Sequence, residues 1–355
     1  MARSFVFLLF LLALGLALAQ GRLCVLADLT GTGAQDGDLF RKGAELALKE
    51  VGLPYAILDS QSSPQGAVTA ASRALNQERC TALVGPSRST TMRAVIPLLK
   101  EANRAVAFTQ ATSVLLTQEG RGYVFRLAAS DAVSSKAFAQ VAEELGAKRL
   151  AIIYSNDAFG RGLYELFSGE TRSEIVVAEA YTSGSRDYTA QLLKARGAEL
   201  LVIFGTFSED AAALARQYRD LGLRVPVLAN KVFITSVTQQ LAGSQLDGFY
   251  VIADFYEGAN PQAIRFGRNF RMAYGLAPDP NSSGGYDGVK VYAEALRRAG
   301  KPDLEEVRKA LLGIKNYPIT SGLLSFREDG EGIFEVSLLR FQGATARFVK
   351  QVRVR

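Results

Sequence analysis

The stretch LCVLADLTGTGAQDGDLFRKGAELALKEV (residues 23–51) joins a short apolar run to a glycine-rich turn and then to an amphipathic segment. Residues 23–28 have the length and composition of a buried strand, and residues 37–51 place apolar side chains at helical spacing. A strand that passes through a glycine turn into a helix is the repeating unit of parallel α/β sheets. This unit recurs along the chain.

The recurrence falls into two series, each typical of a parallel sheet with helices on both faces. The first predicts strands at 23–28, 54–59, 81–85 and 105–109, with helices at 37–51, 65–78 and 89–102. The second predicts strands at 122–127, 149–154, 174–179, 199–204 and 226–229, with helices at 131–146, 158–169, 187–196 and 208–222. We therefore expect an α/β fold with two doubly wound parallel-sheet lobes.

The last hundred residues follow a different pattern. A strand at 248–254 precedes helices at about 261–275, 283–299 and 303–313, and alternating strands follow at 322–326, 333–341 and 345–354. These elements are expected to return to the two lobes, which makes a multi-crossover hinge with a ligand cleft beside it. We assign residues 20–127 and 255–322 to lobe 1, and residues 128–254 and 323–355 to lobe 2.

The N-terminus has the three parts of a secretory signal peptide. Arg3 is followed by an apolar stretch from Phe5 to Leu18 and by the small residues around Ala19. The stretch is shorter than the roughly 20 residues that span a bilayer. We expect cleavage after Ala19 and a protein located in the periplasm.

The 355-residue chain contains no histidine, which excludes Ser-His and Cys-His catalysis and most zinc or copper sites. We expect no cofactor, no metal and no catalytic residue, and binding that is nearly independent of pH between about 6 and 8. The net charge of +6 is scattered among acids, so no nucleic-acid partner is expected. The turn Gly31–Gly37 with Asp59 is similar to a dinucleotide fingerprint, but its third glycine falls one residue late.

The two cysteines of the chain, Cys24 and Cys80, stand at the starts of the first and third predicted strands. Those strands are neighbours in a doubly wound sheet, so we expect a disulfide between the two residues in an oxidising compartment. The alternative is a pair of buried thiols.

Two loops that follow predicted strands carry hydroxyl groups. Residues 85–91 (GPSRSTT) lead into a helix, whose N-terminus favours an anion, and residues 109–112 (TQAT) follow the next strand. Both loops lie at the carboxyl ends of strands, where open α/β sheets bind ligands. Helix capping by Ser89 and turn formation by Thr112 are the purely structural alternatives.

At this point the chain resembles the Leu/Ile/Val-binding family of periplasmic binding proteins, which serve ABC transporters. The matching stretches are LTGTGAQDGDLFRKGAELAL (29–48), VGPSRST (84–90), FTQATSVLL (108–116), YVFRLAASD (123–131), LGAKRLAIIYSNDAFGRG (145–162), DYTAQL (187–192) and ARQYRDLGL (215–223). Their order along the chain makes the likeness specific. It implies the type I fold of that family and a ligand held between the lobes.

The resemblance also implies particular ligand contacts on lobe 1. The family serine that holds the ligand carboxylate matches Ser89, and the residue after it matches Thr90. A backbone-and-threonine pair on the next loop matches Ala111 and Thr112, with Gln110 adjacent.

The contacts implied on the other side of the pocket depart from the family pattern. Its two aromatic residues match Phe159 and Phe207, which lack the hydroxyl group. The position that holds a ligand ammonium with an acid is Lys231 here, Asp36 stands at a position that is usually apolar or aromatic, and Arg88 lies in the carboxylate loop.

Four interpretations of these charges are open. In the first, Asp36 binds the ligand ammonium group in place of the family acid. In the second, Lys231 and Arg88 bind a further acidic group on the ligand. In the third, Asp36 and Lys231 pair across the cleft. In the fourth, the alignment is shifted and Asn230 or Lys231 is exposed.

We therefore expect an exported binding protein, and not an enzyme, that captures a small carboxylate-bearing ligand, an amino acid or a related organic acid. A ligand with a second carboxylate would suit the charges of Lys231 and Arg88. A ligand with an aromatic ring would stack between Phe159 and Phe207. The expected partners are the permease and ATPase subunits of an ABC transporter, and the expected oligomeric state is a monomer. The alternatives are a periplasmic ligand-sensing module and an exported enzyme that uses Asp36 and Lys231.

Overall fold

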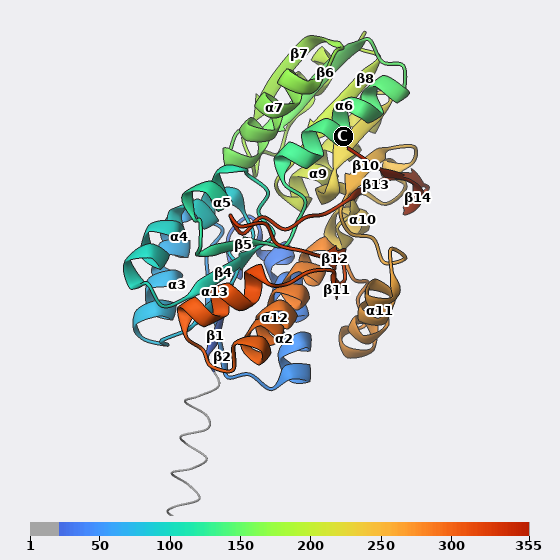
Figure 1. The fold of residues 1–355 in the computed structure, drawn as a ribbon. Coiled ribbons are helices and arrows are strands. Elements are labelled where there is room, and N and C mark those ends of the chain that lie inside the picture. The colour runs from blue at the N-terminus through green and yellow to red at the C-terminus, as the bar shows by residue number, and fades with distance from the viewer. Residues whose placement is uncertain (1–20, 355) are drawn as a thin grey trace, which may run out of the picture.

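Two large sheets, one in each half of the molecule, and a two-stranded sheet lie within residues 21–354, which the computed structural model describes (Figure 1). The expected signal peptide, residues 1–19, lies outside the described residues. Among helices within residues 21–354, none combines the length and the apolarity needed to cross a bilayer. The two-lobed α/β architecture expected from the sequence is confirmed.

Lobe 1 contains a five-stranded sheet of order β2-β1-β3-β4-β5 in which all neighbours are parallel. Its strands are β1 (Leu23–Ala27), β2 (Tyr55–Asp59), β3 (Ala82–Val84), β4 (Val106–Thr109) and β5 (Val124–Arg126). Its helices are α2 (Ala34–Val51), α3 (Pro64–Asn76), α4 (Ser89–Ala102), α5 (Leu115–Glu119), α11 (Pro261–Tyr274), α12 (Pro280–Ala299) and α13 (Leu304–Leu312).

Strand β1 shows how the sequence produces helices on both faces of this sheet. Alternate side chains of a strand point to opposite faces. Leu23 and Val25 join a buried cluster with residues of α2 and α12, whereas Cys24 and Leu26 join a cluster with residues of α3 and α4. A strand that is buried on both faces has an uninterrupted apolar sequence, as residues 23–27 do.

Helices α2 and α12 touch backbone to backbone. A Cβ at Gly43 would lie 1.8 Å from the carbonyl oxygen of Ser282, and a Cβ at Gly285 would lie 2.0 Å from that of Phe40. Only glycine fits at such contacts. The first turns of α12 therefore pack against the middle of α2.

Lobe 2 contains a seven-stranded sheet of order β14-β13-β10-β9-β8-β6-β7, in which β13 runs antiparallel to both of its neighbours, β10 and β14. Its strands are β6 (Arg149–Ser155), β7 (Glu174–Tyr181), β8 (Leu200–Phe204), β9 (Val227–Asn230), β10 (Tyr250–Ala253), β13 (Val336–Gln342) and β14 (Thr345–Val352). The helical segments are α6 (Asp131–Glu144), α7 (Ala158–Glu170), α8 (Thr189–Lys194), α9 (Ser208–Asp220), η1 (Lys231–Ile234), α10 (Ser236–Ala242) and η2 (Gly243–Leu246).

The described chain passes between the lobes after β5, after β10 and after β12 (Gly322–Leu324). The sequence predicted that the C-terminal elements return to both lobes, and β13 and β14 do extend the second sheet. The strand expected at 322–326 is shorter and does not join that hairpin. It pairs with β11 (Tyr317–Ile319), a strand too short to have been recognised.

The expected disulfide joins Cys24, in β1, to Cys80, two residues before β3. Strands β1 and β3 are parallel neighbours, with Leu23 opposite Ala82, and the two cysteine Cα atoms lie 5.8 Å apart. The prediction is confirmed.

The bridge closes a loop with a sequence separation of 56, so it restricts the unfolded chain strongly. We expect the Cys24→Ala/Cys80→Ala variant to lose roughly 2–4 kcal/mol of unfolding free energy. Urea titration followed by circular dichroism measures this loss. Identical midpoints for the two proteins, with two free thiols in wild-type protein purified without reductant, would contradict the assignment.

Candidate ligand-binding site

A cavity of ≈ 110 Å³ lies between the lobes, where the carboxyl ends of strands from both sheets meet. Loops after β3, β4 and β5 line it from one side, and loops after β8, β9 and β10 line it from the other. Most residues expected to contact a ligand do line this cavity: Asp36, Arg88, Ser89, Gln110, Ala111, Thr112, Phe159 and Lys231.

Thr90 and Phe207 lie outside this cavity and line an outer one of ≈ 260 Å³. Thr90 is exposed on the first turn of α4. The ring of Phe207 stacks on the guanidinium of Arg88, with 4.0 Å between Cζ and the ring centroid. Phe159 lines both cavities, so the two rings expected to flank a ligand share the second cavity and not the first.

Two loops of lobe 1 are tied together beside the cavity. The Thr109 hydroxyl donates to the carbonyl of Pro86 over 2.7 Å, and the backbone N–H of Ser113 donates to the Ser89 hydroxyl oxygen over 3.3 Å. Ser89 is the first residue of α4 and Arg88 is its N-cap, without a side-chain capping bond. The first N–H groups of a helix have no acceptor within it, so this edge offers donors to an anion.

The carboxylate of Asp131 is buried at the cavity and has no hydrogen-bond partner for either oxygen among the described residues. Asp131 begins α6, and its backbone N–H donates to the carbonyl of Thr112 over 2.9 Å. Burial raises the pKa of Asp131 to about 6, against the opposing influence of the Thr112 hydroxyl and of the charges of Arg126 and Lys231. Asp131 is not among the residues on which the expectation of pH-independent binding rested.

Lys231 forms an ion pair within its own lobe. Its Nζ lies 2.9 Å from both carboxylate oxygens of Asp254, and Asp254 also accepts the N–H of Ala129 over 2.9 Å. The suggested pairing of Lys231 with Asp36 is not formed, because each of these residues has a different partner.

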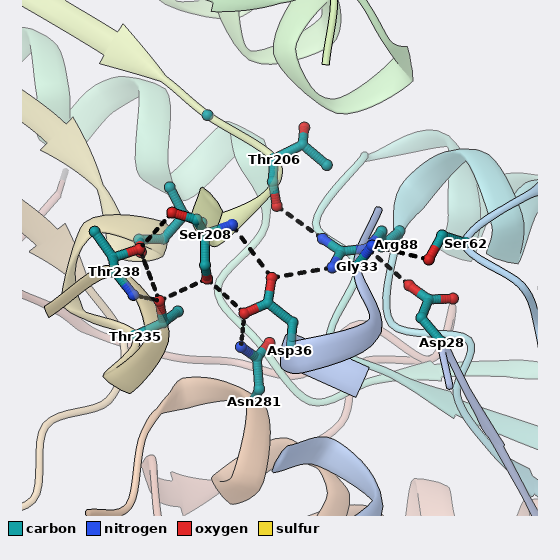
Figure 2. Close-up of polar contacts among 12 residues, drawn as sticks. Asp28, Gly33, Asp36, Ser62, Arg88, Thr206, Ser208, Thr235, Thr238 and Asn281 are labelled. Atoms are coloured by element: carbon teal, nitrogen blue, oxygen red, sulfur yellow. Dashed lines mark hydrogen bonds and ion pairs between the residues drawn. The ribbon is translucent and has the colours of Figure 1, made fainter. Parts of the chain in front are cut away.

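Asp36 instead belongs to a network that joins the lobes (Figure 2). Arg88 donates from Nε to Asp28 over 2.8 Å, from Nη2 to Asp36 over 3.1 Å, and from Nη1 across the cleft to the Thr206 carbonyl over 2.7 Å. Asp36 also accepts the Ser208 hydroxyl of lobe 2 over 2.5 Å. Arg88 thus shares its charge between two carboxylates.

The network continues on both sides of the cleft. Asn281, in the first turn of α12, donates to Asp36 over 3.1 Å, and Ser208 exchanges a hydrogen bond with Thr235 over 2.6 Å. Ser236 of lobe 2 donates from its N–H and its hydroxyl to Asp279 of lobe 1, each over 3.2 Å. The lobes are closed on each other by polar contacts around the cavity.

The sequence reasoning missed Asp131 and Asp254 as site residues. Asp131 comes four residues after the predicted strand 122–127, and Asp254 is the last residue of the predicted strand 248–254. The rule that ligands bind at the carboxyl ends of strands could have found them.

Two α/β lobes with a ligand cavity at the crossings between them define a bilobal solute-binding protein. Residues 22–346 match the model of the periplasmic binding protein family, so the chain belongs to this family.

The chain is 27% identical to an amino acid binding protein of Pseudomonas aeruginosa, over 90% of this chain and 89% of that protein. It is 26% identical to a Leu/Ile/Val-binding protein homologue of Brucella melitensis, over 86% and 87%. A leucine-binding protein from Thermotoga maritima, 26% identical, superposes with a TM-score of 0.86 over 94% and 98% of the two chains.

A solute-binding protein from R. palustris in complex with benzoate has the same fold, with a TM-score of 0.86 over 93% and 96% of the chains and 17% identity. Proteins of this kind are solute-binding components of transporters and not enzymes. The alternative of an exported enzyme that uses Asp36 and Lys231 is set aside.

The buried charge of Asp131 predicts a pH-dependent effect on stability. Its folded-state pKa of about 6 lies above the ordinary value of 3.8, so ionised Asp131 lowers stability as the pH rises from about 4 through 6. We expect Asp131→Asn to leave stability unchanged near pH 4 and to raise it by on the order of 1–3 kcal/mol at pH 7.5.

Urea titrations of the ligand-free proteins at several pH values test this expectation. Glu165→Gln makes the same chemical change at an exposed position of α7 and should show no such trend. A pH-independent difference between wild-type protein and Asp131→Asn would contradict the assignment.

Proposed function

We propose that this chain captures a small α-amino acid in the closed cleft and delivers it to an ABC-type permease. The observation that carries the proposal is the buried, unpartnered carboxylate of Asp131, which lines the same cavity as the donor groups of Ser89 and Thr112. A ligand with an ammonium group and a carboxylate would satisfy both sides.

In this proposal the loops of lobe 1 bind the ligand carboxylate. Ser89 stands in the first turn of α4, where the helix dipole favours negative charge, and Thr112 lines the cavity from the following loop. Closure of the lobes would exclude water from these contacts and strengthen them.

In this proposal the carboxylate of Asp131 pairs with the ligand ammonium group. An ionised carboxylate that is buried without a partner is costly, and an ammonium group at hydrogen-bond distance offsets that cost. Each hydrogen bond to a charged group contributes about 1.5–3 kcal/mol.

The pairing of Lys231 also favours an amino acid over a dicarboxylate. Lys231 is neutralised by Asp254, and Arg88 is held by Asp28 and Asp36. Both cations are therefore already neutralised by carboxylates, which makes either of them a weaker site for a second acid on the ligand.

The relatives support the same class of ligand and the proposed cellular context. They include proteins named for binding amino acids and for binding leucine, isoleucine and valine. In this proposal residues 1–19 direct export to the periplasm with cleavage after Ala19, and a monomer presents the closed lobes to the permease and ATPase subunits.

Matched compounds test the two halves of the proposed site. We expect leucine or valine to bind more tightly than its deaminated acid and its decarboxylated amine, measured by titration calorimetry. Asp131→Asn should weaken amino acid binding by about 10- to 100-fold and leave the deaminated acid nearly unaffected. Ser89→Ala should weaken the amino acid and the deaminated acid together.

The control is Thr69→Ala, which removes a hydroxyl from the exposed surface of α3 and should change neither affinity. Equal affinity for an amino acid and its deaminated acid, in wild-type protein, would rule out the role of Asp131. Failure of all twenty common amino acids to bind would rule out the proposed function.

A further inference from the structure

Arg126 lies directly behind the loop that lines the cavity after β4. Its side chain is fully buried at the end of β5. Nη1 donates to the carbonyl of Ala111 over 3.0 Å, and Nη2 donates to that of Ser113 over 2.9 Å. One guanidinium thus holds two carbonyl groups of the same short loop.

The remaining backbone groups of residues 111–113 are almost all engaged. The N–H of Ala111 donates to the Thr109 hydroxyl oxygen, that of Ser113 donates to the Ser89 hydroxyl oxygen, and the Thr112 carbonyl accepts from Asp131. Among the hydrogen bonds of the described residues, none uses the N–H of Thr112. Within residues 111–113, this group is the one backbone donor that remains for a ligand.

Peptide geometry links that free N–H to Arg126. The carbonyl of Ala111 and the N–H of Thr112 belong to one peptide unit, and in a trans peptide they point in opposite directions. Because Arg126 draws the carbonyl toward the interior of lobe 1, the N–H must point away from Arg126, and Thr112 lines the cavity on that side.

The position of Arg126 is itself fixed from a distant part of the chain. Nε donates to Glu331 over 2.9 Å, and the backbone N–H of Arg126 donates to the Gly330 carbonyl over 3.0 Å. Glu331 lies on the segment that passes from β12 in lobe 1 to β13 in lobe 2. A Cβ at Gly332 would lie 2.4 Å from the carbonyl oxygen of Arg126, so this segment packs closely against β5.

We propose that Arg126 is a positioning residue for ligand recognition: it orients the Ala111–Thr112 peptide so that the Thr112 N–H faces the ligand carboxylate. Only a guanidinium, with several donors in one plane, can hold both carbonyl groups and Glu331 together. A lysine would keep the charge and lose this geometry. The inference rests on the proposed function, in which the ligand carboxylate binds at this loop.

The test compares leucine with leucinamide, which keeps the ammonium and side chain but has no carboxylate. In wild-type protein leucine should bind more tightly. In Arg126→Lys the ratio of the two affinities should fall about tenfold, because leucine loses the contact and leucinamide never makes it. Arg172→Lys makes the same change at a side chain that is 88% exposed; it is the matched control and should keep the discrimination.

A second measurement follows the backbone directly. The amide resonance of Thr112 should shift strongly on addition of leucine to wild-type protein, and weakly in Arg126→Lys. If Arg126→Lys does not fold, Arg126→Met/Glu331→Leu removes both buried charges together, a change that proteins tolerate, and should show the same loss of discrimination.

The outcomes separate the two proposals. Equal binding of leucine and leucinamide by wild-type protein would overturn the proposed function. Discrimination in wild-type protein that persists unchanged in Arg126→Lys, or an equal loss of both affinities, would overturn the role of Arg126 alone.

Discussion

The carboxylate of Asp131 is a buried charge whose oxygens have no hydrogen-bond partner among the described residues, and protein interiors tolerate such a charge only at a cost. The charges around it do not remove that cost. Lys231 is held by Asp254, and Arg88 is held by Asp28 and Asp36. The closed cleft therefore has an excess of negative charge, which a cationic group on a ligand would neutralise.

The contacts that join the lobes determine where such a group can bind. Arg88 reaches the Thr206 carbonyl and Asp36 reaches Ser208, so the loops of both lobes meet around one small cavity. These contacts cross the cleft, so an opening of the lobes would break them. A ligand that neutralises Asp131 would bind this closed form preferentially, and such a difference in affinity is what drives a hinge equilibrium.

Much of the fold could be predicted because its signals are local. The apolar run at 23–27 and the helical periodicity that follows it identify a strand and a helix, and their repetition identifies the sheets. The helices at 115–119 and 236–242 were missed because they are too short to show a period. The disulfide was predictable because Cys24 and Cys80 begin strands that a doubly wound sheet makes neighbours.

The site was predicted less completely because its decisive interactions connect distant positions. Lys231 and Asp254 are 23 residues apart and meet only because β9 and β10 are parallel neighbours. From the sequence alone, a ligand contact of Lys231, its pairing with Asp36 and an exposed position all stayed open. Phe207 and Phe159 do line one cavity, but the Arg88 guanidinium, fixed from lobe 1, also stacks on the ring of Phe207.

The most direct test is a crystal structure of the protein with leucine bound. The account predicts the ligand nitrogen within about 2.7–3.2 Å of an Asp131 carboxylate oxygen, and the ligand carboxylate at the Thr112 N–H and the Ser89 hydroxyl. A ligand bound in the opposite orientation, or one that leaves Asp131 without a partner, would contradict it.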